Sequence, residues 1–217
     1  MKHRIITMVL LILLAASGLR AGGLPRGFFR EAELGVTGGL SMARMWGLEA
    51  KDRDWKAGGW GGVYAVLPVA ENLSFRPEVN FTMKGYRYSF YEDEAAQSNK
   101  IYASLDLNYL DFPLLLQFAI PVQDGLAPEF IFGPALSLNL AGIARSRTGK
   151  VKASDKADNI RKTDLAIIAG ARIRYKGRLF VNVRAGAGFL SIIDVQLPPK
   201  RYNLWGMAGI EYSFRKP

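Results

Sequence analysis

The side chains that could carry out chemistry are few in this chain. Its 217 residues include no cysteine and a single histidine, His3. Thiol chemistry, disulfides and Cys-rich metal sites are therefore excluded, and His3 falls in a segment that we expect to be removed. The acidic run Glu92-Asp93-Glu94 could bind Ca²⁺ weakly, but it lacks EF-hand spacing, which favours a solvated loop. We predict no catalytic residue, no cofactor and no metal site.

The remaining reactive groups are arginines and carboxylates that recur at alternate positions of predicted strands. If the apolar face of these strands meets lipid, the polar face lines a lumen. Eight strands enclose a space that side chains can fill. We therefore predict a plug of charge-assisted hydrogen bonds, with a gated ion or proton path as the alternative. The predicted lumenal polar residues are Arg76, Glu78, Asp111, Gln117, Arg172, Arg174, Arg184 and Glu211.

A second charged group lies between Ile143 and Thr163, where seven cations face two aspartates, Asp155 and Asp158. We predict a long extracellular loop here that contacts lipopolysaccharide headgroups, with simple solvation as the alternative. The cations of this basic segment are Arg145, Arg147, Lys150, Lys152, Lys156, Arg161 and Lys162. Trp46 and Trp55 flank another predicted loop, and tryptophans at such positions most often belong to an interfacial belt; ligand binding is the alternative.

The start of the chain has the order of a secretory signal peptide. Basic residues come first, an apolar run from Ile5 to Ala16 follows, and small residues end it at Gly18. The run is shorter than the roughly 20 residues that a transmembrane helix needs. We predict a signal peptide over residues 1–21, cleaved near 18–21. The net charge of +10 would suggest nucleic acid as a partner, but an exported chain does not meet it.

The rest of the chain alternates apolar and polar residues with a period of two, which indicates strands. The clearest segment is Leu73 to Tyr86, and short and long connections alternate along the chain. This pattern predicts an all-β fold, an eight-stranded antiparallel up-and-down transmembrane β-barrel over residues 33–214. A soluble β-sandwich or lipocalin-like barrel is the alternative, although sandwich strands are usually about 5 or 6 residues long. The predicted strands are Glu33–Met42, Ala57–Pro68, Leu73–Tyr86, Ala103–Ile120, Pro128–Gly142, Asp164–Lys176, Leu179–Phe189 and Asn203–Phe214.

The fourth predicted strand breaks the alternation, because Asp106 and Asn108 share a face with Leu110 and the apolar residues after it. Either a β-bulge lies near Asn108 and Tyr109, or the strand has left the bilayer by that point. We favour the second interpretation, since this part of the strand follows a long predicted loop.

Several stretches resemble the PorT-like outer-membrane β-barrel family of Bacteroidetes-type bacteria. The most specific runs from Asn108 to Leu116 (NYLDFPLLL), and Leu73 to Glu78 (LSFRPE) and Val183 to Phe189 (VRAGAGF) support it. The resemblance implies an outer-membrane barrel, some of whose relatives take part in secretion or gliding.

From the pattern and the resemblance together we predict a non-enzymatic protein with a structural or interaction role. Its expected partners are outer-membrane lipids, lipopolysaccharide among them, and an envelope or secretion protein. A narrow solute or ion channel is the first alternative, and a soluble lipocalin-like carrier is the second.

Overall fold

The computed structural model describes residues 32–47, 54–93, 98–122, 128–148, 151–157, 159–193 and 200–214. The predicted signal peptide lies outside these residues. No helix among them is long and apolar enough to cross a membrane. The strands are β1 (Glu33–Trp46), β2 (Lys56–Ala70), β3 (Leu73–Asp93), β4 (Ser98–Ala119), β5 (Pro128–Thr148), β6 (Val151–Lys156), β7 (Thr163–Lys176), β8 (Leu179–Gly188) and β9 (Tyr202–Ser213).

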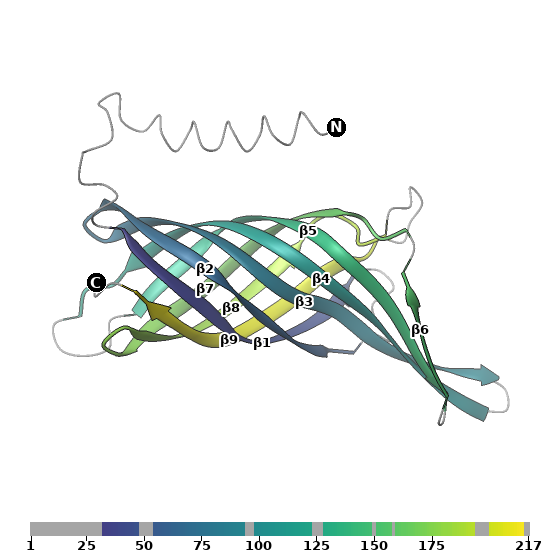
Figure 1. Ribbon diagram of the computed structural model, residues 1–217. Helices are drawn as coiled ribbons and strands as arrows, with labels where there is room; N and C mark the ends of the chain where they lie inside the picture. Colours follow the sequence, from purple (N-terminus) through teal and green to yellow (C-terminus); the bar gives the residue numbers. More distant parts are fainter. Residues whose placement is uncertain are drawn as a thin grey trace. The chain divides into compact units, whose positions relative to one another are not determined.

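The strands close into a ring (Figure 1). Antiparallel pairing runs β4-β3-β2-β1-β9-β8-β7-β5, and β5 pairs again with β4. This ring contains eight strands, while β6 lies outside it and pairs with β5 alone among the described strands. The predicted eight-stranded antiparallel barrel is therefore confirmed, with one strand added beyond the ring.

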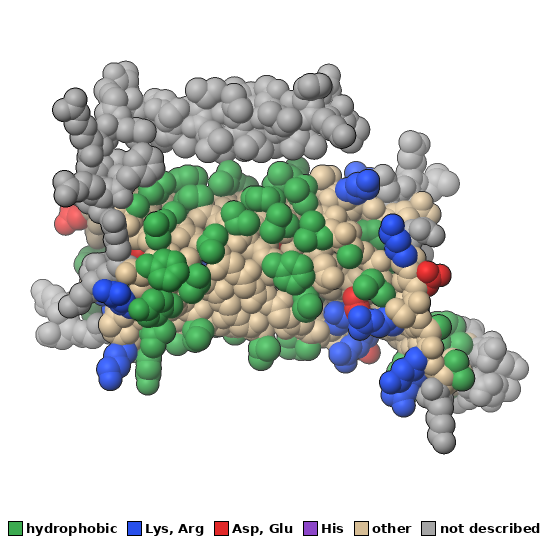
Figure 2. All heavy atoms as spheres, viewed as in Figure 1, with side chains coloured by type: hydrophobic (Ala, Val, Ile, Leu, Met, Phe, Trp, Pro, Cys, Tyr) green, Lys and Arg blue, Asp and Glu red, His purple; other side chains and the backbone are tan. Residues whose placement is uncertain are grey.

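Residues that alternate along each strand face the lumen and the outer wall of the barrel in turn. In β8, Phe180 and Asn182 are buried in the lumen, whereas Val181 and Val183 are 49% and 57% exposed on the outer wall. Successive side chains of a strand point to opposite faces. In a closed barrel one set therefore faces the lumen, and the apolar set faces the lipid. Figure 2 shows these hydrophobic side chains over the middle of the barrel, with lysines and arginines gathered toward its ends.

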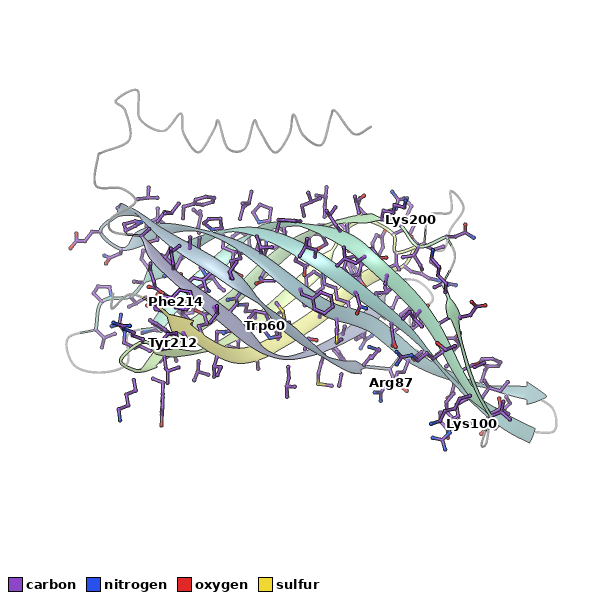
Figure 3. All side chains as sticks on the ribbon, viewed as in Figure 1. Trp60, Arg87, Lys100, Lys200, Tyr212 and Phe214 are labelled. Carbon is purple, nitrogen blue, oxygen red and sulfur yellow. The ribbon has the colours of Figure 1, made fainter. Side chains whose placement is uncertain are left out.

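Aromatic side chains mark both ends of the apolar wall. Tyr212 and Phe214 form an edge-to-face pair with ring centroids 6.0 Å apart at the end where the short turns lie. Trp46 and Tyr202 lie 5.2 Å apart at the opposite end, where the long connections lie. Figure 3 places Tyr212 and Phe214 far from Lys200, which lies at the long-connection end. This distribution is typical of interfacial aromatic girdles.

Glycines let large aromatic side chains lie over the neighbouring strand on the inner wall of the barrel. Gly35 is paired with Tyr64, and a Cβ at Gly35 would lie 2.5 Å from Cζ of the Tyr64 ring. Gly186 is paired with Trp205 in the same way, and its Cβ would lie 2.5 Å from Trp205 Cε2. Since only glycine leaves this space, the rings can cover neighbouring strands instead of pointing straight to the barrel axis.

Two predicted loops are replaced by hairpins. The segment from Arg87 to Tyr102 was expected to be a loop, yet β3 continues to Asp93 and β4 starts at Ser98. The basic segment was also expected to be a loop, yet β5 continues to Thr148 and pairs with β6. These segments form a sheet that we call the extension; it consists of residues 87–93 of β3, 98–104 of β4, 145–148 of β5 and all of β6. Loop predictions failed here because polar residues dominate strands that have no apolar face to bury.

The irregularity near Asn108 lies on β5 and not on β4. Asn108 pairs with Ala141 and Tyr109 with Asn139, so Leu140 is an extra residue in β5. Burial along β4 keeps its alternation, with Leu105, Leu107 and Tyr109 inside. A register shift does lie at Asn108 and Tyr109, as one interpretation held, but its extra residue belongs to β5. β4 itself keeps its alternation, and its outward side becomes polar at Asp106.

The extra residue inverts the orientation of everything after it in β5. Before Leu140, odd-numbered residues such as Ile131 and Ser137 are buried in the lumen. After it, Arg145 pairs with Ser104 and Arg147 pairs with Tyr102, both on the outward side of β4. Leu140 thus decides that the arginines of the basic segment face outward.

Single-cysteine variants test this inside and outside assignment, because the chain contains no other cysteine. We expect Val183→Cys, at a position 57% exposed, to react with a maleimide dye in the folded protein. Its fluorescence should then be quenched by brominated lipid chains. Ala135→Cys, at a position 2% exposed, should react only after heating unfolds the barrel. Equal labelling of the two folded variants would contradict the assignment.

Candidate functional site

A cluster of buried charges fills the lumen near the short turns, and Glu211 on β9 lies at its centre. Glu211 Oε1 accepts hydrogen bonds from Arg76 Nη2 at 2.8 Å and from Arg184 Nη2 at 2.7 Å. Its other oxygen, Oε2, accepts from Arg172 Nη1 at 3.1 Å. One carboxylate therefore serves three guanidinium groups from three strands, β3, β7 and β8.

Glu78 on β3 completes a closed cycle with the same groups. It accepts from Arg76 Nε at 2.5 Å and from Arg184 Nη1 at 2.6 Å. Arg76 and Arg184 thus each bridge Glu78 and Glu211. All four side chains in the cycle have no exposed surface. Charge-assisted bonds in such a buried site are stronger than neutral ones, and the mutual pairing offsets the cost of burying the charges.

Arg172 extends the cluster toward the barrel rim. Its Nη1 donates to Glu33 Oε1 at 3.0 Å, and its Nε donates to Glu129 Oε2 at 2.8 Å. Gln117 joins the two parts, because it accepts from Arg76 Nη1 at 3.1 Å and donates to Glu129 Oε2 at 2.5 Å. We call these connected residues the lumenal network; its members are Glu33, Tyr64, Arg76, Glu78, Gln117, Glu129, Arg172, Arg184 and Glu211.

Aromatic rings cover the guanidinium groups of the network. The Tyr64 ring centroid lies 4.1 Å from Arg76 Cζ, and its hydroxyl donates to Glu33 Oε1 at 2.9 Å. The Phe180 ring lies 4.2 Å from Arg172 Cζ, and the Trp60 ring lies 4.9 Å from Arg184 Cζ. These rings add cation–π attraction and occupy the space beside the charges. Charges and rings are therefore packed together in this part of the lumen.

Two of the predicted lumenal residues lie outside this network. Asp111 accepts a hydrogen bond from Lys84 Nζ at 3.0 Å, in a separate pair farther from the short turns. Lys84 Nζ also lies 3.8 Å from the Trp205 ring centroid. Arg174 is half-buried beside the Phe180 ring, 5.3 Å from its centroid, and forms no ion pair with another described residue. The other six predicted residues lie within the network.

The residues missed as site residues include Glu33, Tyr64 and Glu129 of the network, Asn80, which donates to Glu78 Oε2 at 2.7 Å, and Lys84 of the separate pair. Glu33 and Glu129 lie at or next to the first residue of their strands, where the alternation is too short to identify a face. Lys84 shares the inward face of Arg76, and its even position in β3 was a usable signal. Nothing in the sequence pattern indicates that Tyr64 lies against Gly35 and reaches Glu33.

The basic segment presents its cations at the long-connection end. Arg145, Arg147, Lys152, Lys156 and Lys162 are exposed, and Lys150 lies outside the described residues. Arg161 is half-buried and donates from Nε to the Ser191 carbonyl at 3.1 Å. Asp106, on the outward side of β4, pairs with Arg145 at 2.8 Å and with Lys56 at 3.1 Å.

The remaining predicted features lie at the same end. Trp46 and Trp55 are 39% and 41% exposed, and the Arg44 guanidinium lies 5.6 Å from the Trp55 ring. Of the acidic run, Glu94 lies outside the described residues, and the structure gives only the backbone of Glu92 and Asp93 in β3. In the part of the chain that the structure describes, no group of three or more acidic or histidine side chains is arranged to hold a metal ion.

A family model described as outer membrane protein beta-barrel domain matches residues 17–194. The chain belongs to this family. The family and the closed ring of strands place the protein in the outer membrane, which excludes the soluble lipocalin-like carrier. Family membership at this level does not distinguish a PorT-like protein from other outer-membrane barrels. No curated protein matches the sequence.

Solved structures of small outer-membrane barrels are similar in fold to this family member. Ail, the attachment invasion locus protein of Yersinia pestis, is 16% identical, with 85% of this chain and 99% of that chain covered and a TM-score of 0.47. Neisserial surface protein A is 12% identical, with coverage of 84% and 99% and a TM-score of 0.43. OprG from Pseudomonas aeruginosa is 10% identical, with coverage of 85% and 96% and a TM-score of 0.40.

Two arginines of β7 provide a matched test of the lumenal network. We expect Arg172→Gln to lower the free energy of unfolding by about 3–5 kcal/mol, because it leaves buried carboxylates without their cation. Arg174→Gln should cost less than about 1 kcal/mol, because Arg174 pairs with none of the network carboxylates. Urea titration of the fast-migrating folded band on unheated gels measures both. Equal losses would contradict a structural role for the network.

Proposed function

We propose that this outer-membrane barrel is a non-enzymatic, PorT-like protein with a structural or interaction role. The observation that carries this proposal is the paired network inside the lumen. Three arginines and four glutamates of the network pair with one another across the barrel. These groups are engaged with one another, which leaves the outer surface and the long connections as the parts that meet other molecules.

The basic segment supports lipopolysaccharide as one of these molecules. Its cations lie at the long-connection end, where side chains would face lipid phosphates in the outer leaflet. Each such cation contributes about 1 kcal/mol of attraction to an anionic membrane surface. A protein partner from the envelope, in a secretion or surface assembly, is the further interaction that the resemblance to PorT-like proteins supports.

A narrow channel is the second candidate, and one observation favours it. Several buried polar atoms of the lumen have no hydrogen-bond partner among the described residues, including Trp60 Nε1, Asn182 Oδ1 and Trp205 Nε1. Buried groups of this kind are normally satisfied by ordered water. The closed cycle of Arg76, Glu78, Arg184 and Glu211 argues against a continuous path, because ions would have to separate these pairs.

Recordings from the full barrel in a planar lipid bilayer distinguish the two candidates. We expect no stable, large conductance, because the network fills the cross-section near the short turns. The double variant Arg76→Ala/Glu78→Ala should show more frequent openings, since it opens the closed cycle without leaving a single unpaired charge. A large, steady conductance of the unmodified protein would overturn the proposal of a closed barrel.

Lipopolysaccharide recovered with the purified protein tests the role of the basic segment. We expect exchange of Arg145, Arg147, Lys150, Lys152, Lys156, Arg161 and Lys162 for Gln to reduce the bound lipopolysaccharide by about tenfold or more. Exchange of Lys176 and Arg178, at the short-turn end, serves as the control. Unchanged recovery of lipopolysaccharide with the altered segment would contradict the contact.

A further inference from the structure

A groove of about 720 Å³ lies on the outward face of the extension. Residues of β3, β4, β5 and β6 line it, and Asp54 and Trp55 close one side. The backbone of Asp54 is held there, because its N–H donates to the Arg87 carbonyl at 2.8 Å and its carbonyl accepts from Arg87 N at 3.2 Å. In Figure 3, Arg87 and Lys100 lie along this part of the molecule, beyond the barrel wall.

The lining of the groove is strongly basic. Asp54 supplies the one carboxylate of the lining, and Arg145 also pairs with Asp106 beside it at 2.8 Å. The five cations of the lining are Arg87, Lys100, Arg145, Arg147 and Lys152. Two of these, Arg87 and Lys100, belong to β3 and β4 and are not part of the basic segment. The register explains how they meet, because Arg87, Ser104 and Arg145 are neighbours across three strands, as are Ser89, Tyr102 and Arg147. The two hairpins therefore bring their cations to one surface.

The other lining residues suit a sugar that carries phosphate. Serine residues accompany the cations on the same face, at positions 89, 104 and 154. Arginine and lysine with hydroxyl donors are the groups that bind phosphate oxygens. Tyr102 is 57% exposed and Trp55 is 41% exposed, so each presents ring surface on which a saccharide can stack. The groove volume falls within the about 300–1,000 Å³ that is usual for small-ligand sites.

The groove opens on the same side of β3 and β4 as their lipid-facing residues, which favours a membrane lipid as the source of the phosphorylated sugar. On β3, the outward positions Val79, Phe81 and Met83 are apolar and 38–40% exposed, and Arg87 continues the same outward row. On β4, the outward row changes from Leu116 at the short-turn end to Tyr102 and Lys100 at the other. A molecule in the groove therefore lies beside the barrel, directly beyond its lipid-facing wall.

We propose that this groove binds the phosphorylated saccharide headgroup of one glycolipid molecule of the outer leaflet. The proposal rests on the function proposed above and deepens it, because it assigns the contact to a built site that joins both hairpins. Arg87 and Lys100 bind the headgroup together with Arg145 and Lys152. Lys156 and Lys162 of the basic segment lie outside the lining and contribute only general attraction.

Two double variants of the full-length barrel separate the groove from the basic segment. Arg87→Gln/Lys100→Gln removes two charges from the groove but none from the segment. Lys156→Gln/Lys162→Gln removes two charges from the segment but none from the groove. Binding is measured to phosphatidylcholine vesicles that contain bisphosphorylated lipid A, and to vesicles that contain its dephosphorylated form. Folded migration on unheated gels verifies that each variant still forms the barrel.

We expect the unmodified protein to prefer the phosphorylated vesicles, the groove variant to bind them roughly tenfold more weakly, and the segment variant to stay within about twofold. Equal weakening by both variants would overturn the groove while leaving the proposed lipopolysaccharide contact in place. No preference for phosphorylated vesicles would overturn both. Soluble glucosamine phosphate that competes as well as the vesicles would overturn a membrane lipid as the source.

Discussion

The pairing of Glu211 and Glu78 with Arg76 and Arg184 is the interaction on which the rest of the barrel depends. An apolar outer wall forces the polar side chains of every strand inward, so their charges must find partners in a space of fixed width. Three strands supply the cycle itself, since Arg76 and Glu78 come from β3, Arg184 from β8 and Glu211 from β9. Arg172 then brings in β1, β5 and β7 through Glu33 and Glu129. Backbone hydrogen bonds close the ring of strands, and ion pairs connect strands across its interior.

This interior also explains the unusual use of glycine and aromatic residues. Tyr64 and Trp205 can lie flat over the neighbouring strands because Gly35 and Gly186 are paired with them. Their rings cover Arg76 and Lys84, respectively. Small residues beside large ones therefore do more than fill volume, because they set the orientation of the rings that shield each cation.

Much of the fold could be predicted from alternation, because a closed barrel translates a period of two directly into inside and outside. The same rule brought six of the eight predicted lumenal residues into one network. It failed where the physical signal is absent. Glu33 and Glu129 lie at strand starts, and the strands of the extension carry polar residues on both faces. The position of Leu140 could not be foreseen either, since one extra residue in β5 leaves no mark in composition.

The bulge at Leu140 divides β5 into two parts that face different surroundings. Before Leu140, the odd-numbered residues of β5 face the lumen, where Glu129 and Ser137 contact buried cations. After Leu140, the odd-numbered residues of the same strand face outward and no longer line the lumen. A gain or loss of one residue at this point would exchange the two faces of the whole hairpin without altering the barrel below. The one extra residue at Leu140 therefore determines which side chains of the extension face outward, while the strand pairing of the barrel stays the same.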